Sequence, residues 1–390
     1  MKAETQGRSS AISVAGIDVV RLEKELAAMW QPPKGEDGKP AASEAGVTRV
    51  CVLNLIVYAT HREERAQIDQ LLDQVMEQVP SRAVILIADR EAETAKLEAY
   101  VSTRCQVGAR GGKQVCGEQI TIEAAGGVIE TVSTAIEPLL MPDVPVFLWW
   151  KDIPDGDDKL FRRLVRVADR VVIDSLAFDK PHEDFQQLDH LIRTNEHLLV
   201  SDINWGRLTS WRTLLASFWD VPDYRPALDD LATVVVEYDP PDAAHEEIAP
   251  QALLIAGWLA GRLGWQFTKD APAAEGATRR LPMLTKEGRH FTLEFRGAPD
   301  RAGHDGLLAS VTFTSAAQDA SFHVAVNEAG TKLDTEARVG ESRHIDRVLA
   351  YEQKTEGERL SRELGLRLRD RVYEATVASA AAFVSALTSS

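Results

Sequence analysis

Cysteine is scarce in this sequence, and so are long apolar segments. Three cysteines in 390 residues cannot form the disulfide framework of a small secreted scaffold, which favours a reducing compartment. No segment approaches the roughly 20 apolar residues that a membrane-spanning helix needs. The start, MKAETQGRSSAISVAG, also lacks the apolar core of a secretory signal. We therefore expect a cytoplasmic protein.

Basic residues are too few to balance the acidic ones. The chain has 44 Lys and Arg against 60 Asp and Glu, a formal charge of −16 at pH 7. Such a surface repels nucleic-acid phosphates and anionic lipid headgroups. We expect neither nucleic acid nor a membrane as a partner.

Common signatures of metal, cofactor and catalytic sites are missing as well. The nine histidines include no HExxH motif, and no cysteine pair has zinc-finger spacing. No GxSxG elbow or GxGxxG fingerprint is present. The glycine-rich stretch at 108–115 departs from the phosphate-loop pattern at Val107 and Gln114, so we interpret it as a hairpin loop. The sequence predicts no catalytic residue, cofactor or metal.

The sequence is rich in apolar residues, which make up 44% of the chain. That fraction allows large cores in two or three domains. Apolar residues at helical spacing predict a helix over 18–30, and the proline- and glycine-rich residues 31–46 predict a linker. Residues 1–47 are therefore expected to form an N-terminal helix and a flexible linker.

Apolar strands alternate with amphipathic helices after this linker. Strands are predicted at 51–59, 83–88, 144–150, 170–175 and 198–203, with a hairpin formed by 100–107 and 114–124. Near-continuous apolar runs are typical of parallel strands covered by helices on both faces. The pattern predicts an α/β domain over 48–245 with a mainly parallel, doubly wound sheet.

The pattern changes after residue 245. A predicted helix over 250–263 precedes segments with period-two alternation, HFTLEFRG, LLASVTFTS and ASFHVAVN. One or two helices close the chain. Residues 246–390 are therefore predicted to form a smaller α+β domain with an antiparallel sheet.

Cys105 and Cys116 lie equally far from the centre of the predicted hairpin loop. Symmetric pairing of the two strands would place them opposite each other, near disulfide reach. Two interpretations remain open: a thiol switch, or two small buried thiols that pack as apolar groups. Cys51 lies in a strongly apolar strand and is expected to be inert.

Polar residues follow the ends of three predicted strands. In open α/β sheets ligands bind outside the carboxyl ends of the strands, which makes five residues candidates for a crevice that binds a small phosphorylated sugar: Lys151, Asp174, Asp202, Asn204 and Arg207. The other interpretation is that polar residues end buried strands because the chain emerges into water there.

Tryptophan is concentrated between residues 149 and 265, which hold seven of the eight. Protein interfaces concentrate Trp and Arg. Trp211 fits a core stripe on a helix, whereas the adjacent Trp149 and Trp150 point to opposite faces of a strand, so one of them could face a partner. The residues predicted to form or support a contact surface are Trp149, Trp150, Trp205, Arg207, Trp211 and Arg212.

Several long strings carry a family resemblance: RVCVLNLIVYA, GGKQVCGEQITIEA, LLMPDVPVFLWWKD, DRVVIDSLAFD, SDINWGRLTSWRTLLASFWD and LIAGWLAGRLGW. Together they resemble the OpcA family, the glucose-6-phosphate dehydrogenase assembly proteins. The resemblance implies a non-catalytic assembly factor and allosteric activator of that dehydrogenase, which would support NADPH production in the oxidative pentose phosphate pathway. It also gives the cysteine pair a possible link to redox regulation. The competing hypotheses are an α/β enzyme or sensor that uses the crevice, and a scaffold without regulatory effect.

Overall fold

The computed structural model describes residues 6–10, 17–30, 47–60, 65–107, 114–240, 247–269, 272–275, 278–299, 304–344, 347–351, 354–366 and 368–388. The predicted linker at 31–46 and the tip of the predicted hairpin lie outside these residues. The chain divides into two compact units. The first comprises Met1–Ile173, Glu196–Ser201 and Thr355–Leu368, and the second comprises Asp174–Asn195, Asp202–Lys354 and Arg369–Ser390.

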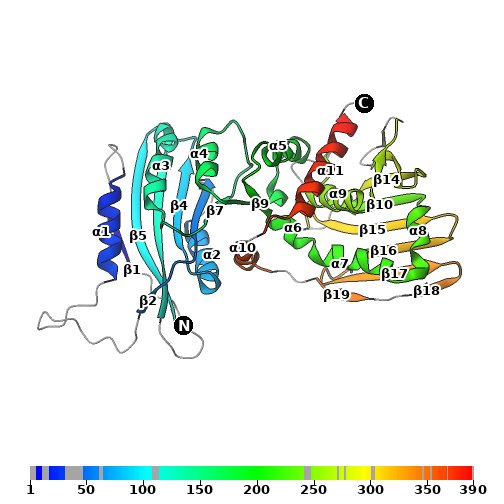
Figure 1. The fold of residues 1–390 in the computed structure, drawn as a ribbon, viewed down its shortest axis with the longest axis horizontal. Coiled ribbons are helices and arrows are strands. Elements are labelled where there is room, and N and C mark those ends of the chain that lie inside the picture. The colour runs from blue at the N-terminus through cyan, green and yellow to red at the C-terminus, as the bar shows by residue number, and fades with distance from the viewer. Residues whose placement is uncertain are drawn as a thin grey trace, which may run out of the picture. The chain divides into compact units, whose positions relative to one another are not determined.

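The first unit is built on a nine-stranded sheet in the order β1-β5-β6-β4-β3-β7-β8-β9, with β2 paired to β6 (Figure 1). Its strands are β1 (Gln6–Ser10), β2 (Val47–Arg49), β3 (Asn54–Thr60), β4 (Arg82–Asp89), β5 (Lys96–Val107), β6 (Gln114–Ala125), β7 (Val146–Trp150), β8 (Arg170–Ile173) and β9 (Leu199–Asp202). Strands β6, β4, β3, β7 and β8 pair in parallel, while β1 and β5 are antiparallel additions. The predicted mainly parallel sheet is confirmed.

Helices cover this sheet because its central strands are apolar on both faces. Every residue of β3 and β4 except the last one of each strand is buried, as expected for strands between two helical layers. The helices of the unit are α1 (Val19–Met29), α2 (Arg65–Gln78), η1 (Gly126–Val128), α3 (Ile129–Ile136), η2 (Glu137–Leu139), α4 (Lys159–Val167) and α10 (Glu356–Gly365). The predicted helix over 18–30 is confirmed, with Asp18 accepting a hydrogen bond from the Arg21 amide at its start.

The strand order reverses between β3 and β7, the place where doubly wound sheets bind ligands. Here the end of β3 carries Tyr58, whose ring stacks on Trp150 of β7 with centroids 3.7 Å apart. The Tyr58 hydroxyl accepts a hydrogen bond of 2.7 Å from Arg90. The sequence from Thr60 to Arg65 contains no glycine, although a pyrophosphate-binding turn needs glycine for close approach of the backbone.

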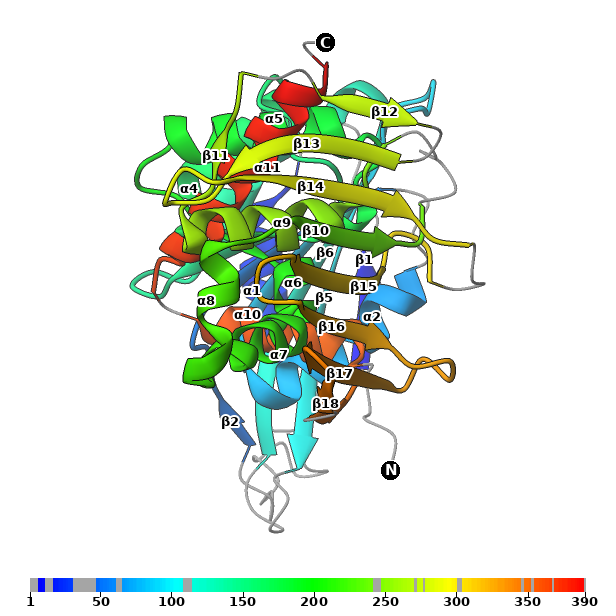
Figure 2. The same cartoon turned by 90° about the vertical axis from the view of Figure 1, so that its right-hand side faces the viewer.

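The second unit is built on a ten-stranded sheet in the order β11-β13-β14-β10-β15-β16-β17-β18, with β12 paired to β13 and β19 to β17. Figure 2 shows its six middle strands side by side. The strands are β10 (Thr233–Tyr238), β11 (Gln266–Phe267), β12 (Ala273–Glu275), β13 (Thr278–Leu284), β14 (His290–Gly297), β15 (Leu308–Ser315), β16 (Ala320–Val326), β17 (Lys332–Val339), β18 (Ser342–His344) and β19 (Val348–Ala350). The sheet is mixed, because β10 and β14 are parallel.

Helices of the second unit pack on one face of that sheet through aromatic side chains. They are η3 (Ser175–Ala177), α5 (Pro181–Thr194), α6 (Ile203–Arg207), α7 (Thr209–Ser217), η4 (Phe218–Asp220), η5 (Pro222–Tyr224), α8 (Pro226–Asp229), α9 (Pro250–Leu263) and α11 (Arg371–Thr388). Phe383 of α11 contacts Phe295 of β14, and Trp219 contacts Phe313 and Phe322. Gly264 ends α9 in the left-handed conformation that glycine adopts without strain.

Two features of the second unit differ from the prediction. The predicted boundary near residue 245 would leave β10 in the first domain, but β10 lies in the middle of the second sheet, between β14 and β15. The second sheet is also mixed and has ten strands against nine, so it is neither purely antiparallel nor smaller. Strands that pair across such long sequence distances leave no local pattern from which their pairing could be predicted. Among the described residues, no helix is long and apolar enough to cross a membrane.

Candidate functional site

The segment DINWGR contains the capping residue Asp202 and the whole of α6, and it lies at the centre of a buried polar network. Asp202 accepts hydrogen bonds from the Ser175 amide (3.0 Å) and hydroxyl (2.7 Å), and from the Asn204 amide (2.9 Å). A fourth donor is the Tyr373 hydroxyl of α11, at 3.2 Å. Asp202 is 1% exposed, and Ser175 and Asn204 are fully buried. The carboxyl group therefore holds η3, α6 and α11 together.

Burial controls the ionisation of Asp202. Loss of solvent and, to a smaller extent, the negative charge of Asp174 raise the pKa of its carboxyl to about 6, although hydrogen bonds from Ser175 and Asn204 act in the opposite direction. The group thus changes charge at a higher pH than an exposed aspartate. Because its oxygens are engaged by donors of this chain, their chemistry here is structural.

The network continues through two amide side chains. Asn204 accepts a hydrogen bond of 2.9 Å from Gln251 of α9 and donates one of 3.1 Å to the Ser175 hydroxyl. The Gln251 side chain in turn accepts a hydrogen bond of 3.0 Å from the Leu308 amide at the start of β15. Four helical elements of the second unit and one strand of its sheet therefore meet in one buried chain of hydrogen bonds, as expected because buried polar groups need hydrogen-bond partners.

Arg207 and Arg212 place charge beside this network. Both guanidinium nitrogens of Arg207 bind the two oxygens of Asp174, in a bidentate ion pair. The guanidinium of Arg212 lies 3.2 Å from the centre of the Trp205 ring, in a cation–π contact. The Trp205 indole N–H donates a hydrogen bond of 2.9 Å to Asp370. The α6–α7 segment thus carries two arginines, of which Arg212 lies over the Trp205 ring and Arg207 is paired with Asp174.

All the predicted aromatic residues lie in the interior, including Trp205, which is 7% exposed. Trp149 and Trp150 are each 1% exposed, and Trp211 is fully buried. The expectation that Trp149 or Trp150 faces outward is therefore not met, because the parallel sheet is covered on both faces. A role in supporting a contact surface remains a prediction for these three residues.

The predicted crevice residues are divided between the two units. Asp202 and Asn204 belong to the buried network, and Arg207 pairs with Asp174, all within the second unit. Lys151 belongs to the first unit, where its ammonium lies 2.9 Å from Glu356 and 4.4 Å from the centre of the Trp149 ring. These contacts are made within the chain, so no observation favours the sugar-binding hypothesis.

Cys105 and Cys116 face each other on β5 and β6, in the register that the symmetric hairpin predicts. The structure joins them in a disulfide. The third cysteine, Cys51, is free, and burial raises the pKa of its thiol. The pair is therefore the reducible element of the first unit, and its regulatory role remains a proposal.

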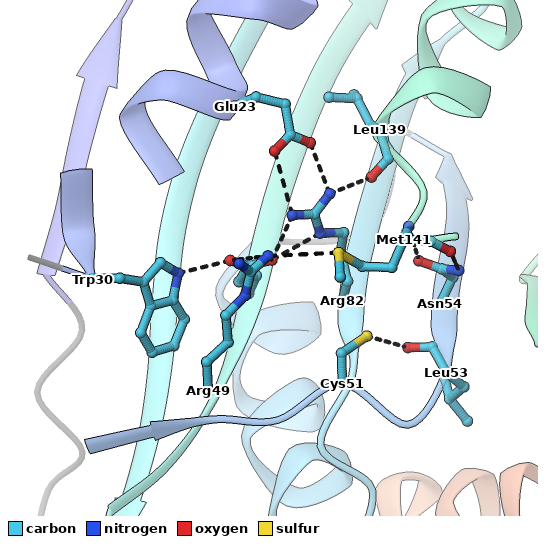
Figure 3. Close-up of polar contacts among 10 residues, drawn as sticks. Glu23, Trp30, Arg49, Cys51, Leu53, Asn54, Arg82, Leu139 and Met141 are labelled. Carbon is cyan, nitrogen blue, oxygen red and sulfur yellow. Dashed lines mark hydrogen bonds and ion pairs between the residues drawn. The ribbon is translucent and has the colours of Figure 1, made fainter. Parts of the chain in front are cut away.

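A second buried polar cluster, shown in Figure 3, is one that the sequence did not predict. Arg82, at the start of β4, is 3% exposed and binds the buried carboxylate of Glu118 at 2.7 Å. It also donates hydrogen bonds to Glu23 of α1 (2.7 Å) and to the Leu139 carbonyl (2.8 Å). Burial alone would lower the pKa of Arg82, but the two carboxylates outweigh it and raise that pKa.

The same cluster fixes the end of α1. The Trp30 indole N–H donates a hydrogen bond of 2.7 Å to Glu118, and Arg49 pairs with Glu118 at 2.9 Å. Three partners therefore share one buried carboxylate and tie the N-terminal helix to the sheet. A charged residue at the first position of an apolar strand, as in RAVILIAD, is the signal that could have revealed this cluster.

Two family models match this chain. Residues 72–190 match the glucose-6-phosphate dehydrogenase subunit N-terminal domain, and residues 199–377 match the C-terminal domain of the same subunit. Both models carry the OpcA name. The matched regions together extend over most of the chain.

Two of the curated relatives are OxPP cycle proteins that carry the name OpcA. The protein of Nostoc punctiforme is 31% identical over 232 residues, which are 59% of this chain and 48% of that relative. The protein of Synechococcus elongatus is 28% identical over 309 residues, 77% of this chain and 67% of that relative. The chain thus spans about half the length of the first relative and about two thirds of the second.

Among solved structures, the 3-ketoreductase KijD10 from Actinomadura kijaniata with bound NADP is 12% identical. The match covers 86% of this chain and 97% of that protein, with a TM-score of 0.49. Similarity this low supports no conclusion about activity.

Proposed function

Because the chain belongs to the OpcA family, we propose that it is a non-catalytic assembly factor and allosteric activator of glucose-6-phosphate dehydrogenase. Through that enzyme it supports NADPH production in the oxidative pentose phosphate pathway. The observation that carries this proposal is the pair of domain matches, named for a subunit of the dehydrogenase and extending over residues 72–190 and 199–377.

The mechanism needs no catalytic residue in this chain. A protein that binds one oligomer or conformer of an enzyme more tightly than another shifts their populations by its difference in affinity. The internal use of the polar candidates supports such a role. Asp202 and Asn204 are buried and hydrogen-bonded within the chain, and Arg207 is paired with Asp174. In this proposal the dehydrogenase alone carries out the catalysis.

We assign the contact to the α6–α7 segment, where Trp205 lies between the Arg212 guanidinium and the Asp370 carboxylate. Tryptophan and arginine together are typical of residues that dominate binding energy. From the interior, Trp211 supports this segment, and Trp149 and Trp150 support the first unit. We also propose that the disulfide between Cys105 and Cys116 places the β5–β6 hairpin under redox control.

Titration of the purified chain into the dehydrogenase tests the contact assignment. Arg212→Ala removes the guanidinium without opening the buried network, so affinity is expected to fall by about tenfold, as for a central interface arginine. Arg193→Ala on α5 is the matched control, because Arg193 is 69% exposed and its ion pair is with Asp189, one helix turn away. Unchanged affinity in the Arg212 variant would refute the assignment.

A further inference from the structure

The two faces of the β5–β6 hairpin contact different helices. Gln119 of β6 donates a hydrogen bond of 3.0 Å to Asp69 of α2. The preceding residue, Glu118, accepts one of 2.7 Å from the Trp30 indole at the end of α1. Alternate residues of a strand point to opposite faces of the sheet. Cys116 therefore lies on the α1 face, one position along that face from Glu118.

Strand β2 connects the disulfide to the carboxylate of Glu118. Arg49 is the partner of Cys116 in the β2–β6 register, and the Val50 amide donates a hydrogen bond of 3.1 Å to the Cys116 carbonyl. The Arg49 guanidinium binds Glu118 at 2.9 Å and lies 5.8 Å from the centre of the Trp30 ring (Figure 3). The backbone of a disulfide-bonded residue thus positions the arginine that contacts the end of α1.

Helix α1 depends on these polar contacts because it buries few side chains. Its buried residues are Leu22 and Leu26. Helix α2, on the opposite face, buries five: Ile68, Leu71, Leu72, Val75 and Met76. The gain from burial grows with the apolar area removed from water. The hydrogen bond of Trp30 and the ion pair of Glu23 with Arg82 therefore contribute a larger share of the attachment of α1.

We propose that the Cys105–Cys116 disulfide is a redox switch for the docking of α1. The intact bond holds the two strands in register at the end of the helix and keeps Arg49 on Glu118. Reduction removes this covalent tie, so the strand ends and the three-residue strand β2 open more often, and the Trp30 end of α1 is released. The switch rests on the redox control proposed for the hairpin and extends it to α1.

The redox step is a thiol–disulfide exchange with a dithiol. A thiolate of the dithiol attacks the sulfur of Cys105, which is half-buried, because Cys116 is fully buried. The bond between the two cysteines breaks, Cys116 leaves as a thiolate and takes up a proton, and a mixed disulfide forms at Cys105. The second thiol of the dithiol then displaces Cys105. The two cysteines gain two electrons and two protons, and the dithiol becomes a disulfide.

Hydrogen–deuterium exchange of the full-length chain tests the switch. The oxidised protein is compared with the same protein after dithiothreitol treatment, and alkylation with mass spectrometry confirms in each sample whether the bond is open. Reduction is expected to accelerate amide exchange in α1 by about tenfold and in α2 by less than about twofold. Helix α2 is the internal control, because it packs on the opposite face of the same hairpin.

Three variants separate the switch from other effects of the reductant. Cys51→Ser keeps the disulfide and is the matched control, so its α1 should respond to dithiothreitol as the wild type does. Cys105→Ser combined with Cys116→Ser should show fast exchange in α1 with or without the reductant. Trp30→Phe keeps an aromatic ring but removes the donor to Glu118. Its α1 should exchange fast even in the oxidised protein and change little on reduction.

Unchanged exchange in α1 of the wild type after the bond has opened would overturn the proposal. Equal acceleration of α1 and α2 would also overturn it, because the disulfide would then stabilise the whole unit without selecting one helix. Alkylation of both Cys105 and Cys116 in the oxidised protein would do the same. The test uses this chain without the dehydrogenase, so the failure of the switch would leave the proposed assembly role standing.

Discussion

The Tyr373 hydroxyl lies 3.2 Å from Oδ2 of Asp202, a residue 171 positions earlier in the chain. This hydrogen bond joins α11 to the start of α6 inside the second unit. Both side chains are buried, so the pair is protected from water. The string DINWGR thus supplies the polar centre of the second unit.

Replacing Asp202 with Ala tests how much this centre stabilises the second unit. The change leaves the amides of Ser175 and Asn204 and the Tyr373 hydroxyl without their acceptor, which we expect to lower the free energy of unfolding by about 2–4 kcal/mol. Urea denaturation followed by tryptophan fluorescence measures the difference. Asp202→Asn keeps one acceptor oxygen and should cost less. Equal midpoints for wild type and the Ala variant would contradict the structural role.

The pKa of Asp202 predicts a pH dependence of stability. Its value in the folded state is about 6, raised mainly by burial, whereas an unfolded aspartate has a pKa of about 3.9. Stability from the protonated carboxyl is therefore complete below pH 4 and is lost as pH rises to 6. Relative to Asp202→Asn, the wild type should lose up to about 3 kcal/mol across that window. A constant difference between the two proteins from pH 4 to 7 would rule this out.

Arg82→Ala should destabilise the first unit, because it leaves the buried Glu118 carboxylate with only Trp30 and Arg49 as partners. Breaking one side of a buried pair costs about 3–5 kcal/mol. Lys159→Ala is the control; its pair with Glu130 is 61% and 59% exposed and should contribute less than about 1 kcal/mol. Thermal melts measure both, and proteolysis near α1 should accelerate only in the Arg82 variant. Equal stability of the two variants would show that the cluster is unimportant.

Reduction of the Cys105–Cys116 disulfide should loosen the hairpin of β5 and β6. A loop closed by residues 11 apart is worth about 3 kcal/mol in the chain-entropy account. Dithiothreitol should therefore lower the free energy of unfolding of the wild type by up to that amount, while Cys51→Ser retains the effect. Mass spectrometry after alkylation reports the bond directly. Alkylation of both cysteines after oxidant treatment would contradict a redox role.

Local sequence patterns predicted the first unit well. Continuous apolar runs such as NLIVYA belong to strands that are buried on both faces, and this makes them easy to recognise. The opposition of Cys105 and Cys116 also followed from the sequence, because a hairpin fixes its own register. In these segments the information that determines structure is local.

Non-local contacts account for what the sequence did not predict. TVVVEY looks like any other apolar strand, and only its partners β14 and β15 place it in the second sheet. Trp149 and Trp150 were expected to offer one outward ring, but a covered parallel sheet has no exposed face. The polar cluster of Arg82 and Glu118 contains a hydrogen bond between Trp30 and Glu118, which lie 88 positions apart. Such partners are set by topology, which one sequence does not display.

The central claim is tested by mixing the purified chain with glucose-6-phosphate dehydrogenase from the same source. NADPH formation is followed at several substrate concentrations while light scattering measures the mass of the complex. The account predicts that a larger complex forms and that activity or apparent substrate affinity rises with it. No complex and unchanged kinetics, under both reducing and oxidising conditions, would contradict it.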